Sequence, residues 1–242
     1  MTTVVLSPHF DDAVLSCGGW LARHAGTTVV TVCSGRPGPG VPADPAWDAL
    51  VPFDDADRAA EARCAEDRAA LEQLDAEQVL LGFLDGAYKD RTGRAHEDRG
   101  VVGTFEEALV DRVGRLLDER MPDRCLFPLG LLHPDHVVTR RAAVSALGTR
   151  PHIRALAYLD LPYGIAFGEA AREEAGAMPG RWLGAEAAPQ AGAPGVLATA
   201  RRRKRSAAGS YRSQLPLLRR SFGPALEASL EPEAERLRAW RA

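Results

Sequence analysis

Short apolar runs alternate with longer amphipathic stretches through the first two thirds of the chain. The apolar runs are rich in β-branched residues and are bounded by turn residues, which is typical of buried strands, and the stretches between them have helical spacing. The expected strands cover residues 3–6, 27–33, 78–83, 124–128 and 153–159, and the expected helices cover residues 14–25, 57–74, 104–120 and 134–147.

Helices between successive strands predict parallel pairing, because right-handed β-α-β crossovers connect strands of one sheet in this way. The sequence therefore predicts an α/β fold with a mostly parallel sheet. Residues 34–45 and 85–100, rich in Gly, Pro and polar side chains, are expected to be irregular loops. Because such sheets bind ligands at the carboxyl ends of their strands, the segments that directly follow the strands are the candidates for chemistry.

The length of 242 residues, of which 45% are hydrophobic, suits one core. We therefore expect a single domain over residues 1–242. The alternation weakens after residue 161, and residues 168–200 are rich in Ala, Gly and Pro. Residues 162–200 are expected to form a flap or a variable substrate-binding segment.

Charge and cysteine usage exclude several classes of protein. The net charge of −3 gives too weak a field for a dedicated nucleic-acid protein. No apolar run reaches the roughly 18 residues of a membrane span, and no basic region precedes the first apolar run, as it does in a secretory signal. The four cysteines form no C-x-x-C pair and so indicate neither a disulfide framework nor a thiolate metal site. We expect a cytoplasmic protein with a small-molecule partner, no nucleic acid and no membrane.

Two short segments carry the candidate chemistry. Ser7-Pro8-His9-Phe10-Asp11-Asp12 follows the first expected strand, and His133-Pro134-Asp135-His136 follows the fourth. If both strands are central, their carboxyl ends bring three His and three Asp together, a set that suits a divalent metal with nitrogen and oxygen ligands. Either segment alone has a plain alternative as a helix start with solvated side chains. Their occurrence together at equivalent strand ends favours a catalytic metal site.

The two segments resemble the signature motifs of the PIG-L/LmbE family of zinc-dependent de-N-acetylases. The resemblance implies a Rossmann-like three-layer sandwich and removal of an acyl group from an amino sugar. It also implies that His9, Asp12 and His136 ligate zinc, or another divalent metal in its place. Asp11 corresponds to the general base, and His133 to the histidine that stabilises the oxyanion or protonates the amine.

Asp135 is placed to hydrogen-bond and orient a histidine, which is a common role for a carboxylate beside a metal ligand. Its alternative is a simple carboxylate at a helix N-terminus. Weaker matches to the family are Arg63-x-x-Glu66, Leu81 to Gly86, and Lys204 with Tyr211 to Gln214. From these matches Arg63 and Asp85 are expected to contact a polyhydroxylated substrate, with a surface ion pair as the alternative for Arg63.

The first motif departs from the family pattern at two positions. Phe10 replaces the usual proline, and Ala13 replaces a glutamate. That glutamate is not among the three ligands, so the departure bears on support of the site and on substrate choice rather than on metal binding. Leu131 and Leu132 stand before His133 where some members have a tyrosine.

The sequence therefore favours a zinc-dependent hydrolase that removes an N-acyl group, acetyl first, from an amino sugar or small glycoconjugate in bacterial secondary metabolism, including antibiotic biosynthesis. A mycothiol-conjugate-type amidase and a catalytically silent carbohydrate- or anion-binding module are the alternatives, and a homo-oligomer is left open. The basic residues 201–205 are expected to form a solvated helix face. His24, His96 and His152 lack partners at ligand spacing and are expected on the surface or in loops.

Overall fold

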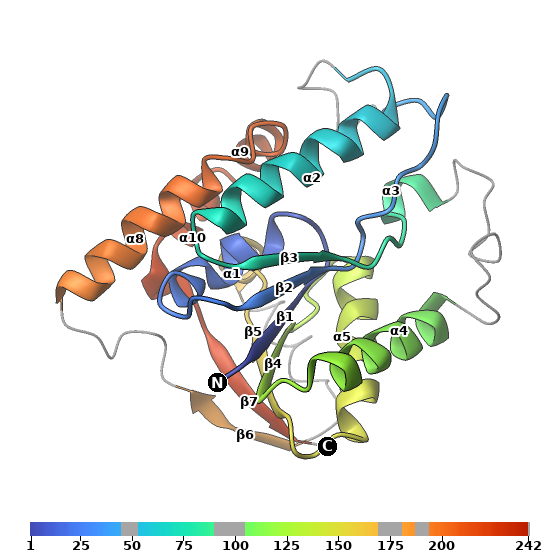
Figure 1. Cartoon of the computed structure of the whole chain (residues 1–242). Coiled ribbons are helices and arrows are strands. Elements are labelled where there is room, and N and C mark those ends of the chain that lie inside the picture. The colour runs from blue at the N-terminus through green and yellow to red at the C-terminus, as the bar shows by residue number, and fades with distance from the viewer. Residues whose placement is uncertain (45–52, 90–104, 169–180, 187–193, 242) are drawn as a thin grey trace.

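A seven-stranded sheet forms the centre of the computed structural model, which describes residues 1–44, 53–89, 105–168, 181–186 and 194–241 (Figure 1). The spatial order of its strands is β3-β2-β1-β4-β5-β7-β6. The strands are β1 (Thr3–Ser7), β2 (Thr28–Thr31), β3 (Glu77–Leu80), β4 (Arg124–Pro128), β5 (Arg154–Tyr158), β6 (Arg181–Glu186) and β7 (Leu237–Arg241).

Strands β1 to β5 pair in parallel, as the alternation of strands and helices predicts. Strand β7 pairs antiparallel with both β5 and β6. The sequence did not predict strands β6 and β7. Their pairing joins segments far apart in the chain, so local periodicity carries no signal for it.

The expected helices all form, with shifted ends. The helix expected at 14–25 begins at Asp12 and ends at Leu21, and part of the loop expected at 85–100 is the short helix α3. Thr104, the first residue of the helix expected at 104–120, lies outside the described residues. The helices are α1 (Asp12–Leu21), α2 (Ala56–Glu72), α3 (Gly86–Lys89), α4 (Phe105–Arg120), α5 (Pro134–Gly148), α6 (Tyr163–Ala166), α8 (Pro194–Ala208), α9 (Leu215–Phe222) and α10 (Pro224–Ser229).

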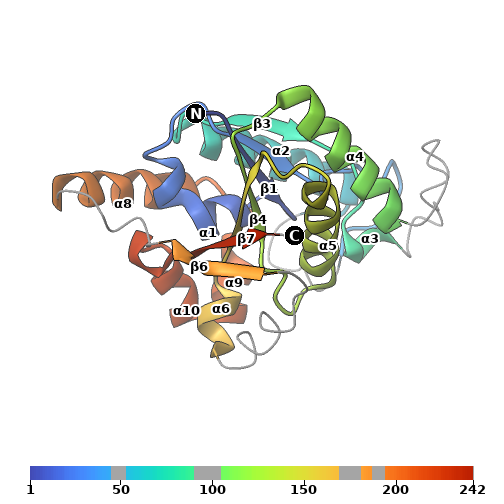
Figure 2. The ribbon, with the colours of Figure 1, turned by 90° about the horizontal axis from the view of Figure 1, so that it is seen from below.

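Helices cover both faces of the sheet and complete three layers (Figures 1 and 2). Helices α4 and α5 lie on one face, and α1, α2 and α8 lie on the other. Because successive strand residues point to opposite faces, one strand supplies both cores. In β1, Val4 and Leu6 pack with the α4–α5 side, while Val5 packs with the α1 side.

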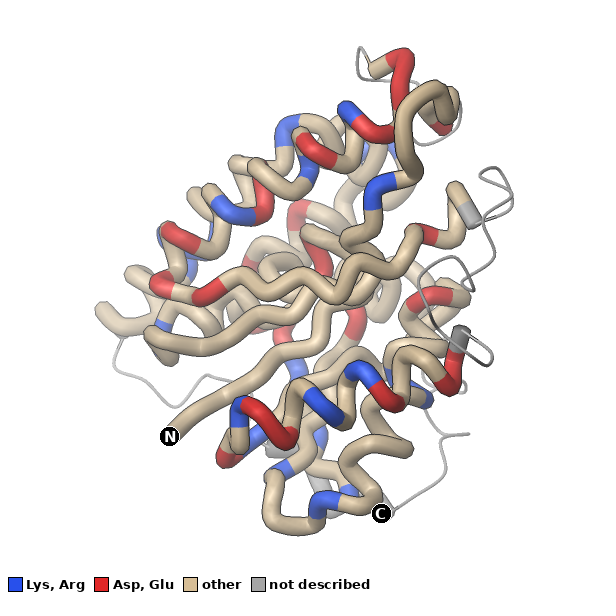
Figure 3. Tube along the Cα trace, turned by 45° about the vertical axis from the view of Figure 1, so that its right-hand side comes forward, with Lys and Arg blue, Asp and Glu red and all other residues tan. Residues whose placement is uncertain are grey.

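The region expected as a flap contains regular structure. Helix α6, strand β6 and the start of α8 fall within residues 162–200. Its remaining residues, 169–180 and 187–193, lie outside the described ones, so the single-domain and flap expectations stay predictions. None of the described helices is long and apolar enough to cross a membrane. Acidic and basic positions are interspersed along the outer helices (Figure 3).

A buried ion pair fastens α8 to α1 and to the C-terminal segment. The Lys204 ammonium lies 2.7 Å from Glu235 Oε1, and both side chains are at most 1% exposed. Glu235 also accepts the backbone N–H groups of Gly19 and Trp20. A Cβ on Gly18 would stand 2.7 Å from Lys204 Cγ, so glycine permits this close approach. The expected solvated face is therefore wrong for Lys204.

Replacing Lys204 by methionine is expected to lower the free energy of unfolding by about 3–5 kcal/mol, because it leaves the buried Glu235 carboxylate without its counter-charge. Urea unfolding measures the change. In the control Arg205→Met, the lost partner is the surface residue Glu231, and the expected cost is below about 1 kcal/mol. Equal costs for the two variants would contradict this account of the buried pair.

Candidate active site

The two motifs meet at the carboxyl edge of the sheet, where the chain order reverses between neighbouring strands. Strand β1 lies between β2 and β4, and such a switch point opens a crevice between the loops that follow the two inner strands. A cavity of about 670 Å³ lies there. Its walls include His9, Asp11, Asp12, His133 and Asp135.

Hydroxyl groups hold the turn that carries the first motif. Ser7 Oγ donates to the His9 carbonyl at 2.6 Å and accepts the Ala13 N–H at 3.0 Å. Tyr211 Oη lies 3.0 Å from the Phe10 carbonyl and 2.9 Å from Asp67 Oδ1. Both side chains of this Tyr–Asp pair are fully buried. Hydrogen bonds from these two hydroxyl groups therefore fix the turn.

The second motif starts helix α5. His133 is the N-cap, with Pro134 in the first helical turn, which suits the fixed φ of proline. The turn out of β4 uses Gly130 at φ 76° and Leu132 at φ 58°, a conformation that is unusual for leucine. A Cβ on Gly130 would lie 3.1 Å from the His136 carbonyl oxygen. This tight turn brings His133 and His136 back over the end of β1.

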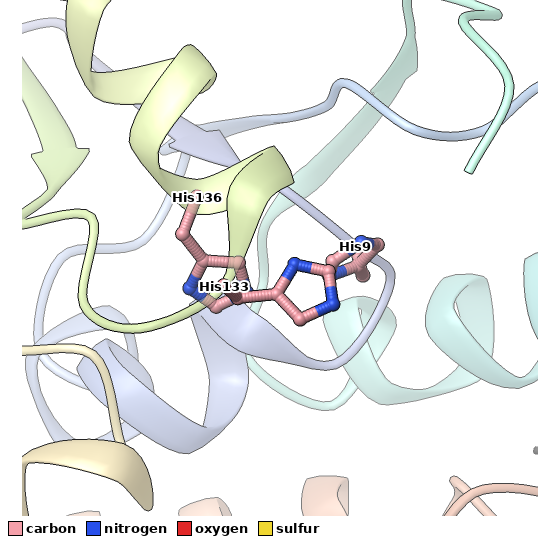
Figure 4. Close-up of side chains that lie close together, drawn as sticks. All are labelled: His9, His133 and His136. Carbon is pink, nitrogen blue, oxygen red and sulfur yellow. The ribbon is translucent and has the colours of Figure 1, made fainter. Parts of the chain in front are cut away.

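The three expected metal ligands lie together. Asp12 Oδ2 is 3.1 Å from His9 Nδ1 and 3.2 Å from His136 Nε2. Figure 4 shows the His9, His133 and His136 rings gathered at this point. Ligand atoms of these three histidines lie within 4.8 Å of one another, so His133 is also within reach of an ion bound there.

Asp160, which follows β5, is a part of the site that the sequence reasoning missed. Its fully buried carboxylate lies 2.6 Å from His136 Nδ1 through Oδ1 and accepts the Gly130 N–H through Oδ2 at 2.9 Å. The bond fixes the proton of a neutral His136 on Nδ1 and directs the lone pair of Nε2 toward Asp12. A carboxylate that orients a metal-binding histidine in this way is a common arrangement.

The two carboxylates beside His136 favour a positive charge on or next to its ring. Nε2 is buried and, among the described residues, has no hydrogen-bond partner of good geometry, although Asp12 Oδ2 is 3.2 Å away. Burial by itself lowers the pKa of His136, but the Asp12 and Asp160 carboxylates raise it to about 9. Either a proton or a metal ion can supply this charge. Because imidazole nitrogen and carboxylate oxygen are ordinary ligands of divalent metals, the residues fit such an ion.

Asp11 is the N-cap of α1 and makes no side-chain cap hydrogen bond. Burial and the neighbouring Asp12 carboxylate raise the pKa of Asp11 to about 7. Asp135 is buried in the first turn of α5, where Oδ2 lies 3.2 Å from His9 Nε2 and accepts the Gly86 N–H. Asp135 therefore contacts a histidine, and that histidine is His9.

His133 has its two ring nitrogens in different surroundings. Nδ1 accepts the Asp135 N–H at 3.3 Å, so a neutral ring carries its proton on Nε2. Burial lowers the pKa of His133 to about 4, and the charges of His9 and His136 contribute to the shift. The ring lines the cavity and is suited to donate a hydrogen bond.

The structure brings the two expected substrate contacts to the same cavity. Arg63 on α2 is 5% exposed, which is against a plain surface ion pair. Asp85 Oδ2 lies 3.7 Å from His9 Nε2. His24 is half-buried on Trp20, His152 is exposed, and His96 lies outside the described residues.

Comparisons with known proteins match the chain to de-N-acetylases. A family model described as GlcNAc-PI de-N-acetylase (PIG-L) matches residues 4–147 and includes both motifs. A 2'-N-acetylparomamine deacetylase of Streptomyces fradiae is 32% identical over 177 residues. That match covers 66% of this chain and 57% of the relative, so the chain spans little more than half the length of this curated protein.

Solved structures resemble the chain over almost its whole length. A zinc-inhibited form of a teicoplanin deacetylase has a TM-score of 0.77 at 26% identity, covering 99% of this chain and 97% of that one. A deacetylase of the A40926 pseudoaglycone, Dbv21, has a TM-score of 0.74 at 29% identity, covering 98% of this chain and 96% of the other. All three of these relatives are therefore deacetylases, and two of them are named after teicoplanin and the antimicrobial reagent A40926.

Proposed function

The chain belongs to the PIG-L family of GlcNAc-PI de-N-acetylases, and from this premise we propose that it is a zinc-dependent hydrolase. Its reaction is removal of an N-acyl group, acetyl first, from an amino sugar or small glycoconjugate of bacterial secondary metabolism. The observation that carries the proposal is Asp12 between His9 and His136, with Asp11 beside it in one cavity. The deacetylase relatives support the reaction type.

His9, Asp12 and His136 would hold the metal. We prefer this set to three histidines because Asp12 Oδ2 is within 3.2 Å of both other ligands. When bound, a divalent metal polarises an amide carbonyl and lowers the pKa of water. Zinc suits the nitrogen and oxygen donors, although another divalent ion could bind the same ligands.

Asp11 would act as the general base. With a pKa near 7, its carboxylate can take a proton from the attacking water and return it near neutral pH. The same proton can then reach the departing amine. Because the pKa of His133 is lowered to about 4, we assign the proton transfer to Asp11.

His133 would stabilise the oxyanion. Its Nδ1 accepts the backbone N–H of Asp135, which leaves the proton of a neutral ring on Nε2. A neutral donor in a partly buried site stabilises the charge that develops on the acyl oxygen. His133 is also 4.8 Å from His9, centroid to centroid, so the donor lies beside the reacting atoms.

Arg63 and Asp85 would hold the hydroxyl groups of the sugar. Both line the cavity and come from segments that follow or flank the sheet edge.

The four cysteines are free thiols, which supports a cytoplasmic location. Whether the protein acts as a homo-oligomer is part of the same proposal to be tested.

The test combines metal analysis with primary-amine release from a panel of N-acetyl amino sugars, their glycosides and a mycothiol-type conjugate. We expect bound divalent metal and turnover of at least one N-acetyl sugar. Preference for the thiol conjugate would favour the amidase alternative, and metal-loaded protein that binds sugars without turnover would favour the binding module. Protein that cannot be loaded with any divalent metal would contradict the mechanism.

Asp160→Asn is expected to weaken metal binding by about 10–100-fold, the usual cost of losing the outer partner of a ligand. The charge that orients His136 is lost, although the side chain keeps its size. Competition with a fluorescent zinc chelator measures the affinity. Asp123→Asn is the control, since Asp123 is exposed and binds Thr2 at the opposite edge of the sheet. Equal affinities for the parent and Asp160→Asn would show that Asp160 does not support the ligand.

A further inference from the structure

A second group of metal-binding atoms lies on the opposite side of the His9 ring from Asp12. His9, Cys33 and Asp135 each offer a ligand atom, and these atoms lie within 4.8 Å of one another. All three residues line the cavity. Cys33 is therefore more than a buried core residue, because it lines the cavity of the site.

A backbone hydrogen bond holds Cys33 close to His9. The N–H of Cys33, just beyond β2, donates to the Pro8 carbonyl at 2.8 Å, which ties its backbone to the turn of the first motif. Its thiol sulfur lies within 4.8 Å of a ring nitrogen of His9, and Cys33 is 4% exposed. The cysteine is thus held beside His9 by backbone pairing.

Asp135 completes the group, and the carboxylate of Asp85 lies on the same side of the His9 ring. Asp135 Oδ2 lies 3.2 Å from His9 Nε2, and Asp85 Oδ2 lies 3.7 Å from the same nitrogen. The ligand atoms of a tetrahedral zinc ion are about 3.3–3.8 Å apart, given bonds of 2.0–2.3 Å. Small side-chain shifts therefore bring the sulfur of Cys33, the nitrogen of His9 and one oxygen of Asp135 to coordination distance.

We propose that His9 Nε2, Cys33 Sγ and Asp135 form a second, inhibitory site for a thiophilic divalent ion such as zinc. The inhibitory effect rests on the proposed function; the binding itself does not. A thiolate with imidazole and carboxylate is a donor set that zinc accepts, whereas magnesium and calcium prefer oxygen alone. The site therefore discriminates between these classes of ion.

Binding has a defined proton balance. The ion would replace the thiol proton of Cys33 and the ring proton of His9 on Nε2, and both protons pass to solvent. Cys33 would then bind as a thiolate, and His9, with its Nδ1 toward the first site, as an imidazolate. His9 is then shared between the two sites through its opposite nitrogens, Nδ1 toward Asp12 and Nε2 toward Asp135. The ion also occupies the cavity next to Asp85, where the sugar is proposed to bind. Inhibition follows from both effects.

Cobalt(II) titration of the metal-free full-length protein tests the binding. A thiolate bound to cobalt gives a sulfur-to-metal charge-transfer band, and His/Asp ligation gives none. The first equivalent is expected to fill the His9–Asp12–His136 site without this band, and the second equivalent to produce it. Absence of the band from the parent protein at excess cobalt would overturn the proposal.

Two cysteine variants make the test specific. Cys33→Ala is expected to lose the band, while Cys64→Ala, altered on helix α2 away from the cavity, is expected to keep it. Cys33→Ser preserves the size of the side chain if the alanine variant fails to fold. A band that persists in the Cys33 variants, or that disappears in Cys64→Ala, would contradict the assignment.

Amine release in rising free zinc tests the inhibition. The parent and Cys64→Ala are expected to lose activity above one equivalent, and Cys33→Ala to need about 10-fold or more zinc for the same fractional loss, since a ligand to the second ion is missing. Equal sensitivity of Cys33→Ala and the parent would overturn the inhibitory role. If the cobalt band behaves as expected but no N-acetyl substrate is turned over, the proposed function fails and the metal site stands.

Discussion

An Asp11→Asn protein is expected to retain its metal and to lose about 10²–10⁴-fold in kcat, the range that a positioned general base contributes. Asparagine has nearly the same size but cannot take a proton from water. Asp11 is buried beside Asp12, and its raised pKa of about 7 suits a group that both accepts and returns a proton near neutral pH. Steady-state amine release, with metal content measured on the same sample, gives the result.

The Asp11 experiment has a matched control in Asp118→Asn. Asp118 lies on α4, is largely exposed and pairs with Arg150, so its substitution is expected to change neither rate nor metal content. An Asp11→Asn protein that hydrolyses as fast as the parent would show that the base is another group. Loss of the metal together with activity would instead make Asp11 a ligand.

Much of this site could be predicted from the sequence because its main residues stand close together in two short segments of the chain. His9 and Asp12 stand together in one turn, and His133 and His136 stand together at one helix start. The alternation of strands and helices then predicts parallel strands whose carboxyl ends meet. Two short segments and one topological rule were sufficient to bring these side chains together.

Asp160 and Cys33 could not be found in the same way. Asp160 stands alone among apolar residues after β5, and its partner His136 is 24 positions away. In the sequence, Cys33 is the last residue of the apolar run that predicts a strand at 27–33. The signal that both shared with the motifs was their position, since each directly follows a parallel strand at the same sheet edge. A search of every strand end for polar or thiol side chains would have included them.

Long-range packing sets the other limit. Lys204 lies in a basic run that is typical of a solvated helix, yet its ammonium is buried on Glu235, 31 positions later. Strand β7 pairs with β5 across some eighty residues of sequence. Neither partner has a local pattern that identifies the other. Burial of such groups depends on which elements pack together, and this is decided by the whole fold.

A His136→Ala protein is expected to lose both metal and activity. His136 Nε2 is a proposed ligand, so metal affinity should fall by more than the about 10–100-fold that follows loss of an outer partner. His24→Ala is the control, because His24 stacks on Trp20 in α1 and has no part in the site. It should keep the metal and the rate of the parent.

His133→Ala separates the two possible ligand sets in the same measurements. With His9, Asp12 and His136 as the ligands, this variant keeps its metal and loses rate, because only the oxyanion donor is removed. If His133→Ala releases the metal as readily as His136→Ala, the three-histidine set is the true one, and Asp12 becomes an acceptor for its neighbours. If His136→Ala keeps its metal and its activity, neither set holds the ion. The pair of variants therefore decides which geometry around Asp12 carries the chemistry.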